Sequence, residues 1–137
     1  MEEACRSRGI AKKFRFVGEV DPDRMPEYIN LADIVVMPSE AETQALVYLE
    51  AQACARLLLA SDIPGAREVI VDGETGLLFR MGDTDDLTAK TLLVASDPKR
   101  RADIGREAWE HMRTHSLSDA VVTYAATLED VVRRHQE

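Results

Sequence analysis

The sequence predicts an α/β protein with a parallel sheet and a helical tail. Over residues 1–80, short apolar runs alternate with helical periods, a pattern typical of parallel strands joined by right-handed crossovers. From residue 81 to 137 only helical periods occur. A chain of 137 residues is long enough for one domain of ordinary size. We therefore interpret residues 1–137 as a single domain.

Four runs rich in β-branched, leucine or aromatic residues are predicted to be buried strands. They are KFRFVG, ADIVVMP, RLLLAS and TGLLFR, at residues 13–18, 32–38, 56–61 and 75–80. Two helices are predicted between them, at about 24–31 and 43–54. Pro64 and Gly65 predict a turn after the third run.

Three further helices are predicted in the tail from their capping residues. They are expected to begin at Asp83 or Thr84, at Asp97 or Pro98, and at Ser118, and to end near Ser96, Thr114 and Arg134. The last helix carries one apolar stripe, so we expect it to pack against another surface. The stripe consists of Val121, Tyr124, Leu128, Val131 and Val132.

Composition excludes several classes of protein. A net charge of -8 repels phosphate backbones, so no nucleic-acid partner is expected. No apolar run reaches the roughly 18 residues of a membrane span, and the start lacks the apolar core of a signal peptide, so we expect a cytoplasmic protein. Cys5 and Cys54 are expected to be reduced thiols, and no Cys/His spacing predicts a metal site.

The stretch PSEAETQALVYLEAQAC, residues 38–54, carries two carboxylates eight positions apart, Glu42 and Glu50. It comes directly after the carboxyl end of a predicted strand, which is where open parallel sheets bind ligands. Leu46, Leu49 and Ala53 are predicted to line one helix face, with Glu50 inside the apolar arc. A carboxylate in that position needs hydrogen-bond partners, from the protein or from ligand hydroxyls.

Each carboxylate also has a purely structural interpretation. Ser39 and Glu42 have the spacing of a capping box, in which each side chain bonds the other residue's backbone amide. Glu50 has the alternative of an internal ion pair. From the residues alone, these alternatives stay open beside ligand binding.

Three segments in order resemble one known domain. They are FVGEVD followed by MPEYINLADIVVMPS, then Glu42 and Glu50 with LVYLEAQAC, then AREVIVDGETGLLF. The run from Val17 to Phe79 resembles the carboxyl-terminal, donor-binding domain of GT-B glycosyltransferases of the family 4 type, glycosyl transferase group 1. The tail, with GDTDDLTAKTLLVASDPKRRADIGREA, is similar to the next part of that domain in the family. The resemblance implies a Rossmann-like parallel sheet with flanking helices and a helical carboxyl-terminal tail, incomplete at its amino terminus.

The resemblance also implies an activity: the donor-binding part of a retaining glycosyltransferase that moves a hexose from a nucleotide sugar to an unknown acceptor. Glu42 would be catalytic, facing the transferred sugar and the diphosphate, and Glu50 would accept hydrogen bonds from the ribose hydroxyls. No metal or cofactor is implied, since helix amino ends and basic side chains hold the diphosphate in such enzymes. The implied donor-binding residues are Glu42, Thr43, Gln44, Ala45, Leu46 and Glu50.

The chain departs from the family pattern at its glycines. Where the family commonly has Gly-Phe-Gly after the first Glu, residues 43–45 read Thr-Gln-Ala. The Cys-Gly-x-Pro segment reads Cys-Ala-Arg-Leu at 54–57, and the Gly-Gly turn reads Pro-Gly at 64–65. Glycine at such positions lets the backbone approach a ligand closely. Expected glycines are thus replaced in all three segments, and one is kept at Gly65.

The first two strands of the family's domain, with their basic diphosphate contacts, precede the region that this chain resembles. In the usual order they lie between strands 14–17 and 34–37. We therefore expect an acceptor-binding amino-terminal half or a second chain as partner, with a homodimer or a rearranged sheet that pairs 14–17 with 34–37 as ways to cover the edges. Alone, the chain is expected to be inactive. The alternative function is a non-catalytic remnant or interaction module of the same fold.

Overall fold

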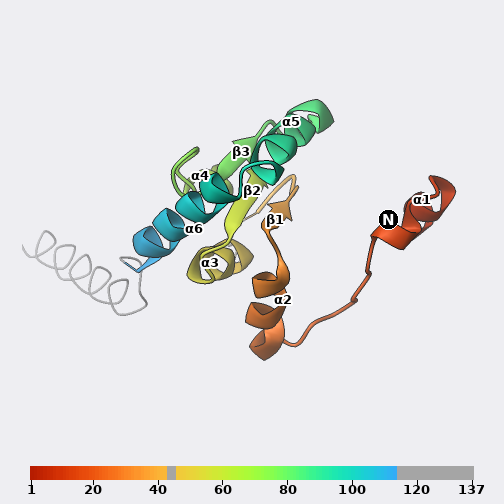
Figure 1. Ribbon diagram of the computed structural model, residues 1–137, viewed down its shortest axis with the longest axis horizontal. Coiled ribbons are helices and arrows are strands. Elements are labelled where there is room, and N and C mark those ends of the chain that lie inside the picture. The colour runs from red at the N-terminus through yellow and green to blue at the C-terminus, as the bar shows by residue number, and fades with distance from the viewer. Residues whose placement is uncertain (43–45, 114–137) are drawn as a thin grey trace, which may run out of the picture.

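The structure of the chain is a computed structural model, in which residues 1–42 and 46–113 are described. Its centre is a three-stranded parallel sheet in the order β1-β2-β3 (Figure 1). The strands are β1 (Ile34–Met37), β2 (Leu57–Ser61) and β3 (Leu77–Phe79). The predicted α/β class is confirmed, and so are the strands predicted at 32–38, 56–61 and 75–80.

Helices cover both faces of the sheet. On one side lie α2 (Met25–Leu31), α3 (Leu46–Ala53) and α4 (Pro64–Arg67). On the other lie α5 (Thr84–Ala95) and α6 (Pro98–Met112). The helices predicted at 24–31, 43–54, 83–96 and 97–114 are confirmed as far as the described residues reach. The helix predicted at 118–134 lies outside them. Over residues 1–42 and 46–113, no helix is long and apolar enough to span a bilayer.

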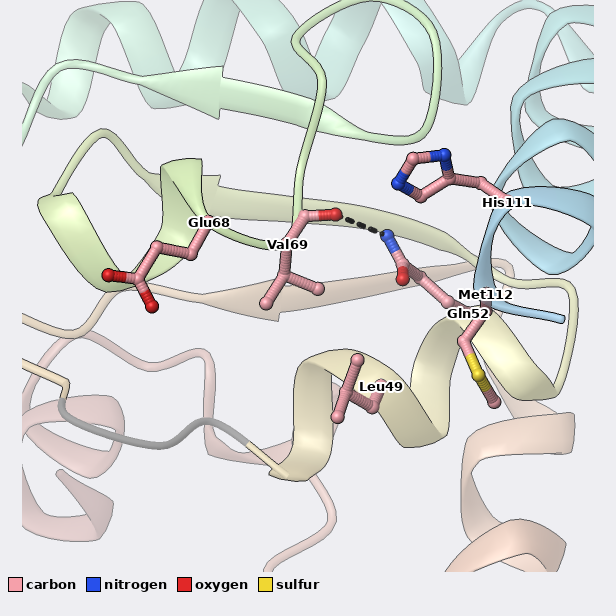
Figure 2. Close-up of a pocket in the computed structure, with 6 residues that line it drawn as sticks. All are labelled: Leu49, Gln52, Glu68, Val69, His111 and Met112. Atoms are coloured by element: carbon pink, nitrogen blue, oxygen red, sulfur yellow. Dashed lines mark hydrogen bonds between the residues drawn. The ribbon is translucent and has the colours of Figure 1, made fainter. Parts of the chain in front are cut away.

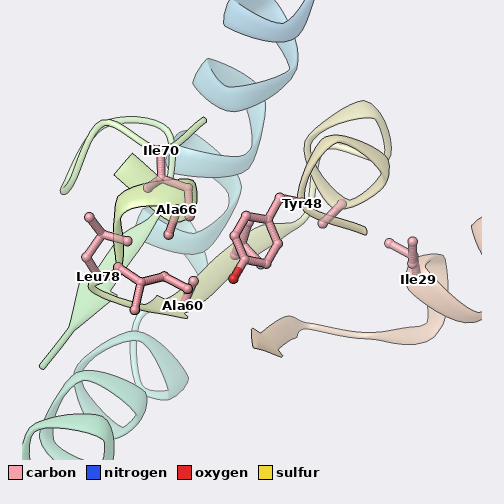
Figure 3. Close-up of a cluster of buried hydrophobic side chains, with 9 residues drawn as sticks. Ile29, Tyr48, Ala60, Ala66, Ile70 and Leu78 are labelled. Atoms are coloured by element: carbon pink, nitrogen blue, oxygen red, sulfur yellow. The ribbon is translucent and has the colours of Figure 1, made fainter. Parts of the chain in front are cut away.

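β2 contributes side chains to both hydrophobic clusters, because successive side chains of a strand point to opposite faces of the sheet. Leu58 and Ala60 pack with one cluster, part of which Figure 3 shows, completed by Ile29, Tyr48, Ala51, Ile63, Ala66, Ile70 and Leu78. Leu57 and Leu59 pack with the other, completed by Leu77, Phe79, Val94 and Ile104. The strand is buried along its whole length.

The strand predicted at 13–18 is wrong. The chain before α2 forms α1 (Glu2–Ser7), η1 (Ala11–Lys13) and η2 (Pro22–Arg24). Between η1 and η2 it runs without a strand partner, and Figure 1 shows this segment and α1 standing apart from the sheet. Phe14 is 48% exposed. Aromatic and β-branched residues favour a strand only where a neighbouring strand completes the ladder, and none of the described strands lies beside them.

The predicted pairing of 14–17 with 34–37 is therefore also wrong. β1 is an edge strand whose only partner within the described sheet is β2. The sequence predicts a buried strand here, but Val36 is 40% exposed, because no described segment covers its outer edge. The described sheet thus ends at β1.

The buried face of α3 differs from the predicted one. Tyr48, Ala51 and Gln52 face the sheet, whereas Leu46 is 60% exposed. The leucines suggested the other face because a polarity pattern counts Gln52 as a surface residue. Its amide is satisfied internally: Nε2 donates to the carbonyl oxygen of Val69 at 3.0 Å. Because its amide is hydrogen-bonded inside the protein, Gln52 can be buried, and the buried face of α3 is not the face that carries the leucines.

Capping aspartates start α5 and α6 as predicted. The Asp83 carboxylate accepts hydrogen bonds from the amides of Asp85 and Asp86, at 3.0 and 2.9 Å, and starts α5. The Asp97 carboxylate accepts one from the amide of Arg100 at 2.9 Å and starts α6. The predicted turn at Pro64 and Gly65 is instead the one-turn helix α4, which begins with proline at its first position.

The turn from α3 to β2 depends on a left-handed alanine. Ala55 has a φ of 52°, which L-residues other than glycine adopt at a cost. The Arg56 amide donates to the Ala51 carbonyl and the Ala55 amide to the Gln52 carbonyl, at 3.0 and 2.9 Å. These two bonds form the Schellman motif, whose left-handed position is usually glycine. This is one of the glycines that the chain replaces.

Replacing Ala55 with glycine should stabilise the protein. The backbone geometry would stay the same without the left-handed penalty, so we expect Ala55→Gly to raise the free energy of unfolding by about 1 kcal/mol. Urea unfolding followed by circular dichroism measures it. Ala53→Gly is the matched control inside helix α3, where glycine should lower stability by about 1 kcal/mol. A loss of stability in Ala55→Gly would contradict the argument.

Candidate functional site

The carboxyl ends of the three strands meet at one edge of the sheet, because the strands are parallel. In open α/β sheets this is where ligands bind. A pocket of about 130 Å³ lies here, between the loops that come after β1 and β3 and the last residue of β2. It is lined by Pro38, Glu40, Ser61, Phe79, Met81, Gly82, Asp83, Thr84 and Leu87. None of these lining residues was singled out by the sequence as a site residue.

Glu42 lies half-buried in the loop after β1, next to the start of α4. A Cβ atom at Gly65 would come within 2.5 Å of the Glu42 carbonyl oxygen, closer than real Cβ atoms come. The glycine retained from the family pattern therefore lets α4 pack directly on the backbone of Glu42. This contact joins the loop after β1 to the loop after β2.

The capping box considered for Ser39 and Glu42 does not cap a helix in the structure. Ser39 could be the cap of a helix only if residues 40–42 were its first turn, and these residues are not helical. The first helical residue described after this loop is Leu46. Thr43, Gln44 and Ala45, predicted to bind the donor, lie outside the described residues.

Glu50 lies half-buried on α3, one turn after the exposed Leu46. Over the part of the chain that the structure describes, its carboxylate makes no hydrogen bond and no ion pair. The internal ion pair considered from the sequence is therefore not found among these residues. Glu50 lies near Cys54: burial raises the pKa of the Cys54 thiol, the Arg56 charge lowers it, and the Glu50 charge raises it further.

Tyr48 was overlooked by the sequence analysis. Its side chain is fully buried between α3 and the sheet, and its hydroxyl oxygen makes no hydrogen bond of ordinary geometry, although the Ser39 side chain lies within hydrogen-bonding reach of it. Burial raises the pKa of Tyr48, the contact with the Ser39 side chain lowers it, and the charge of Glu42 raises it. The hydroxyl therefore lies close to the loop that carries Glu42. A tyrosine within an apolar run looks like an ordinary core residue, so the sequence offered no signal for it.

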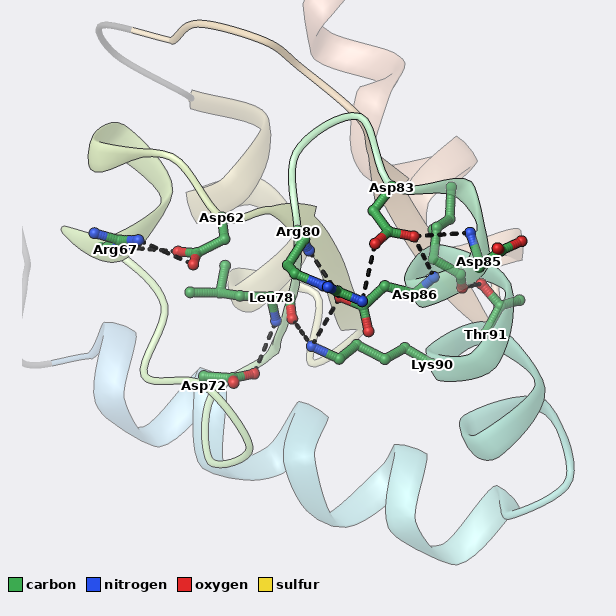
Figure 4. A network of polar contacts seen from close by, with 11 residues as sticks. Asp62, Arg67, Asp72, Leu78, Arg80, Asp83, Asp85, Asp86, Lys90 and Thr91 are labelled. Atoms are coloured by element: carbon green, nitrogen blue, oxygen red, sulfur yellow. Dashed lines mark hydrogen bonds and ion pairs between the residues drawn. The ribbon is translucent and has the colours of Figure 1, made fainter.

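Most charges around the sheet edge are already paired within the protein (Figure 4). Arg67 binds the Asp62 carboxylate through two nitrogens, at 2.5 and 2.9 Å, and this bond lowers the pKa of Asp62. The Arg80 amide donates to Asp86 at 2.8 Å, which lowers the pKa of that carboxyl. Lys90 donates to the Leu78 carbonyl. These contacts fix the loops after β2 and β3.

A second, smaller pocket of about 50 Å³ lies between α3, the segment after α4 and the end of α6. It is lined by Leu49, Gln52, Glu68, Val69, His111 and Met112 (Figure 2). Figure 2 shows Gln52 crossing it to bond Val69. No group of three or more potential metal ligands gathers within residues 1–42 and 46–113.

Comparisons with known proteins agree on one family. The profile of the family described as "Glycosyl transferases group 1" matches residues 1–111. The chain is 33% identical over 135 residues to D-inositol 3-phosphate glycosyltransferase 2 of Catenulispora acidiphila. That match covers 96% of this chain and 32% of the relative, so the chain spans about a third of the length of this curated relative.

Two solved structures share the fold of this chain. Sucrose-phosphate synthase from Thermosynechococcus elongatus superposes with a TM-score of 0.85 and 25% identity, over 98% of this chain and 34% of that enzyme. HepE from Anabaena, solved in complex with UDP-glucose, superposes with a TM-score of 0.81 and 22% identity, over 93% of this chain and 35% of that protein. The arrangement of strands and helices is thus that of one part of a larger protein.

Gly65→Ala tests the contact between α4 and Glu42. The added Cβ would meet the Glu42 carbonyl oxygen, so either α4 or the loop must shift. We expect a loss of about 1 to 3 kcal/mol in the free energy of unfolding. Chemical denaturation measures it, with Pro64→Ala as the control, since Pro64 is exposed and its change adds no atoms. Full stability of Gly65→Ala would show that the approach is not tight.

Proposed function

The chain belongs to the glycosyl transferase group 1 family, and from this premise we propose that it is the nucleotide-sugar donor-binding part of a retaining glycosyltransferase. The whole enzyme would transfer a hexose from a nucleoside-diphosphate sugar to an acceptor that the sequence does not identify. We place the donor along the loop after β1 and the first turns of α3, and base the assignment on Glu50.

Glu50 carries the proposal because its carboxylate is half-buried without an internal partner among the described residues. A carboxylate removed from water needs donors, and two vicinal hydroxyls supply them in a geometry that one carboxylate can accept. In our proposal these are the ribose hydroxyls of the donor nucleotide. The complex of the structurally similar HepE with UDP-glucose supports a ligand of this class.

Glu42 is proposed to be the catalytic residue, facing the transferred sugar and the diphosphate. Its backbone is held against Gly65 of α4, and its loop leaves the carboxyl end of β1. Thr43, Gln44, Ala45 and Leu46 complete the proposed donor site. The exposure of Leu46 agrees with a position at a binding surface. No metal or cofactor takes part in this proposal.

An acceptor-binding amino-terminal half, on the same or another polypeptide, is the proposed partner. The outer edge of β1 is unpaired in the described sheet, and Leu31 just before it is 83% exposed. Backbone groups at such an edge readily accept another strand. A second copy of this chain is the other candidate for that edge.

The exposed edge also favours a second function, that of a non-catalytic interaction module. In that case the replaced glycines at 43, 45, 55 and 64 reflect a lost donor site, and β1 would serve as a docking edge alone. The two functions differ in one observable property. The module would bind no nucleotide.

Glu50→Gln separates the two functions. If Glu50 accepts hydrogen bonds from ribose, the substitution should weaken the binding of UDP or GDP by about 1 to 3 kcal/mol while leaving the ligand-free fold nearly as stable. Isothermal titration and thermal unfolding measure both quantities. Glu107→Gln on the exposed side of α6 is the control. Unchanged affinity together with a large loss of stability would instead indicate a structural role.

The isolated chain should transfer no sugar to any acceptor. We expect its donor affinity to be weak, with a Kd on the order of 0.1 mM or poorer, because these residues span about a third of the length of the curated relative, and part of a whole enzyme's donor contacts would lie outside them. NMR titration with UDP-glucose and a radiolabelled transfer assay check this. Measurable turnover by these 137 residues alone would contradict the proposed division of the enzyme.

A further inference from the structure

We propose that the pocket at the carboxyl edge of the sheet binds an uncharged, polyhydroxylated ring, and that this ring belongs to the acceptor. The pocket is the one of about 130 Å³ that Ser61 and Phe79 line together with the start of α5. The role of acceptor rests on the proposed function, whereas the chemistry of the pocket is independent of it. The inference gives the acceptor a chemical class.

The pocket lies on the α5 side of the sheet. Phe79 and Leu87, which line it, pack in the hydrophobic cluster that α5 and α6 cover. Ser61 points to the same face, because it lies two residues after Leu59 on β2. Helix α3, which carries Glu50, packs on the opposite face. A ligand in this pocket is therefore separate from a nucleotide held along α3.

Three polar side chains of the lining have no partner among the described residues. They are the hydroxyls of Ser61 and Thr84 and the carboxylate of Glu40, which make no hydrogen bond and no ion pair within residues 1–42 and 46–113. Ser61 is only 1% exposed. A hydroxyl removed from bulk water needs a partner, which a ligand or a water molecule in the pocket can provide. The fold thus brings three available polar groups from three segments to one pocket.

The charge of the lining disfavours phosphates and other anions. The two charged residues of the described lining, Glu40 and Asp83, are both acidic. Asp83 is already occupied, since it caps α5 and lies 2.9 Å from the Arg80 guanidinium (Figure 4). Glu40 is the carboxylate that remains for a ligand. A carboxylate accepts hydrogen bonds, and hydroxyl groups donate them.

The rest of the lining and the volume favour a single ring. Its apolar residues are Pro38, Phe79, Met81 and Leu87. Apolar walls with a few polar groups are typical of small-molecule sites, and those for drug-sized ligands measure roughly 300 to 1,000 Å³. At about 130 Å³ this pocket suits a smaller ligand. The CH groups of a ring would pack on the walls while its hydroxyls bond the three polar groups.

The position of the pocket favours the acceptor. Glu40 lies two residues before Glu42, the proposed catalytic residue, in the same loop after β1. A ring in the pocket would therefore lie beside the transferred sugar. In the transfer, an acceptor hydroxyl oxygen bonds the anomeric carbon, the bond from that carbon to the diphosphate breaks, and the hydroxyl proton passes to the departing nucleoside diphosphate. A polyhydroxylated ring supplies that hydroxyl.

Ser61→Ala and Glu40→Gln test the pocket, because each changes a group that makes no bond within the described fold. Wild type should bind glucose, galactose or mannose with a Kd of about 1 mM or weaker, as expected for so small a ligand. Each variant should raise this Kd about threefold to tenfold, the effect of one lost hydrogen bond. Glucose 6-phosphate should bind no more tightly than glucose. NMR titration measures all these constants.

Ser7→Ala and Glu107→Gln are the matched controls, since they change the same groups at exposed positions of α1 and α6. Both should leave the sugar Kd unchanged, and Ser61→Ala should unfold at the wild-type temperature. Failure of wild type to bind any of the three sugars would overturn the inference. So would equal Kd values for Ser61→Ala and wild type. Tighter binding of glucose 6-phosphate would overturn the assignment to an uncharged ligand.

A saturating nucleotide sugar separates the acceptor from the donor. UDP-glucose or GDP-mannose, whichever binds, should leave the Kd for the free sugar no higher. Competition would mean that the pocket holds the donor's hexose, and would overturn the role as acceptor site. Binding of a free sugar but of neither nucleotide sugar would overturn the proposed function, while the comparison of Ser61→Ala with wild type still decides whether the pocket is the sugar site.

Discussion

The fold depends on the burial of β2. All five residues of this strand are buried, and its side chains alternate between the two hydrophobic clusters. Each buried leucine contributes about 1.5 to 3 kcal/mol, but only while helices cover both faces. Parallel strands require such cover, which α3 and α4 give on one side and α5 and α6 on the other. The positions of the loops at the candidate site depend on this burial, because each loop connects a strand of the sheet to a helix that covers it.

The sequence predicted correctly those helix starts that are stabilised by side chains close by in the chain. Asp83 and Asp97 cap their helices with their own side chains, so the starts of α5 and α6 could be read from the sequence. Residues 14–17 have strand composition, but a strand also needs a partner, and the composition of a segment says nothing about its neighbours. The buried face of α3 was misread for a related reason: Gln52 is buried only because Val69 and Thr75 offer it carbonyl groups.

The candidate site was predictable in part. Glu42 and Glu50 stand out by their spacing and by their resemblance to a family pattern, and the structure adds that Glu50 has no internal partner among the described residues. The contact between Gly65 and the Glu42 backbone could not be predicted, since it joins loops from different strands. Tyr48 was equally hidden, because its complete burial depends on neighbours from several different elements.

The free edge of β1 restricts the symmetry of any assembly built on it. In a parallel pair of strands, a residue of one strand bonds the other strand through both its N–H and its C=O group, whereas the residue opposite it directs these groups away from the pair. The two strands of a parallel pair are therefore not equivalent. Two identical copies related by a two-fold axis therefore join their β1 edges only as antiparallel strands. Such a dimer would point its two candidate donor sites in opposite directions, whereas an added parallel strand would keep the site on one edge of a single continuous sheet. The direction of the strand that pairs with β1 thus decides between two assemblies: one continuous sheet with its site on one edge, or a dimer with two sites that point in opposite directions.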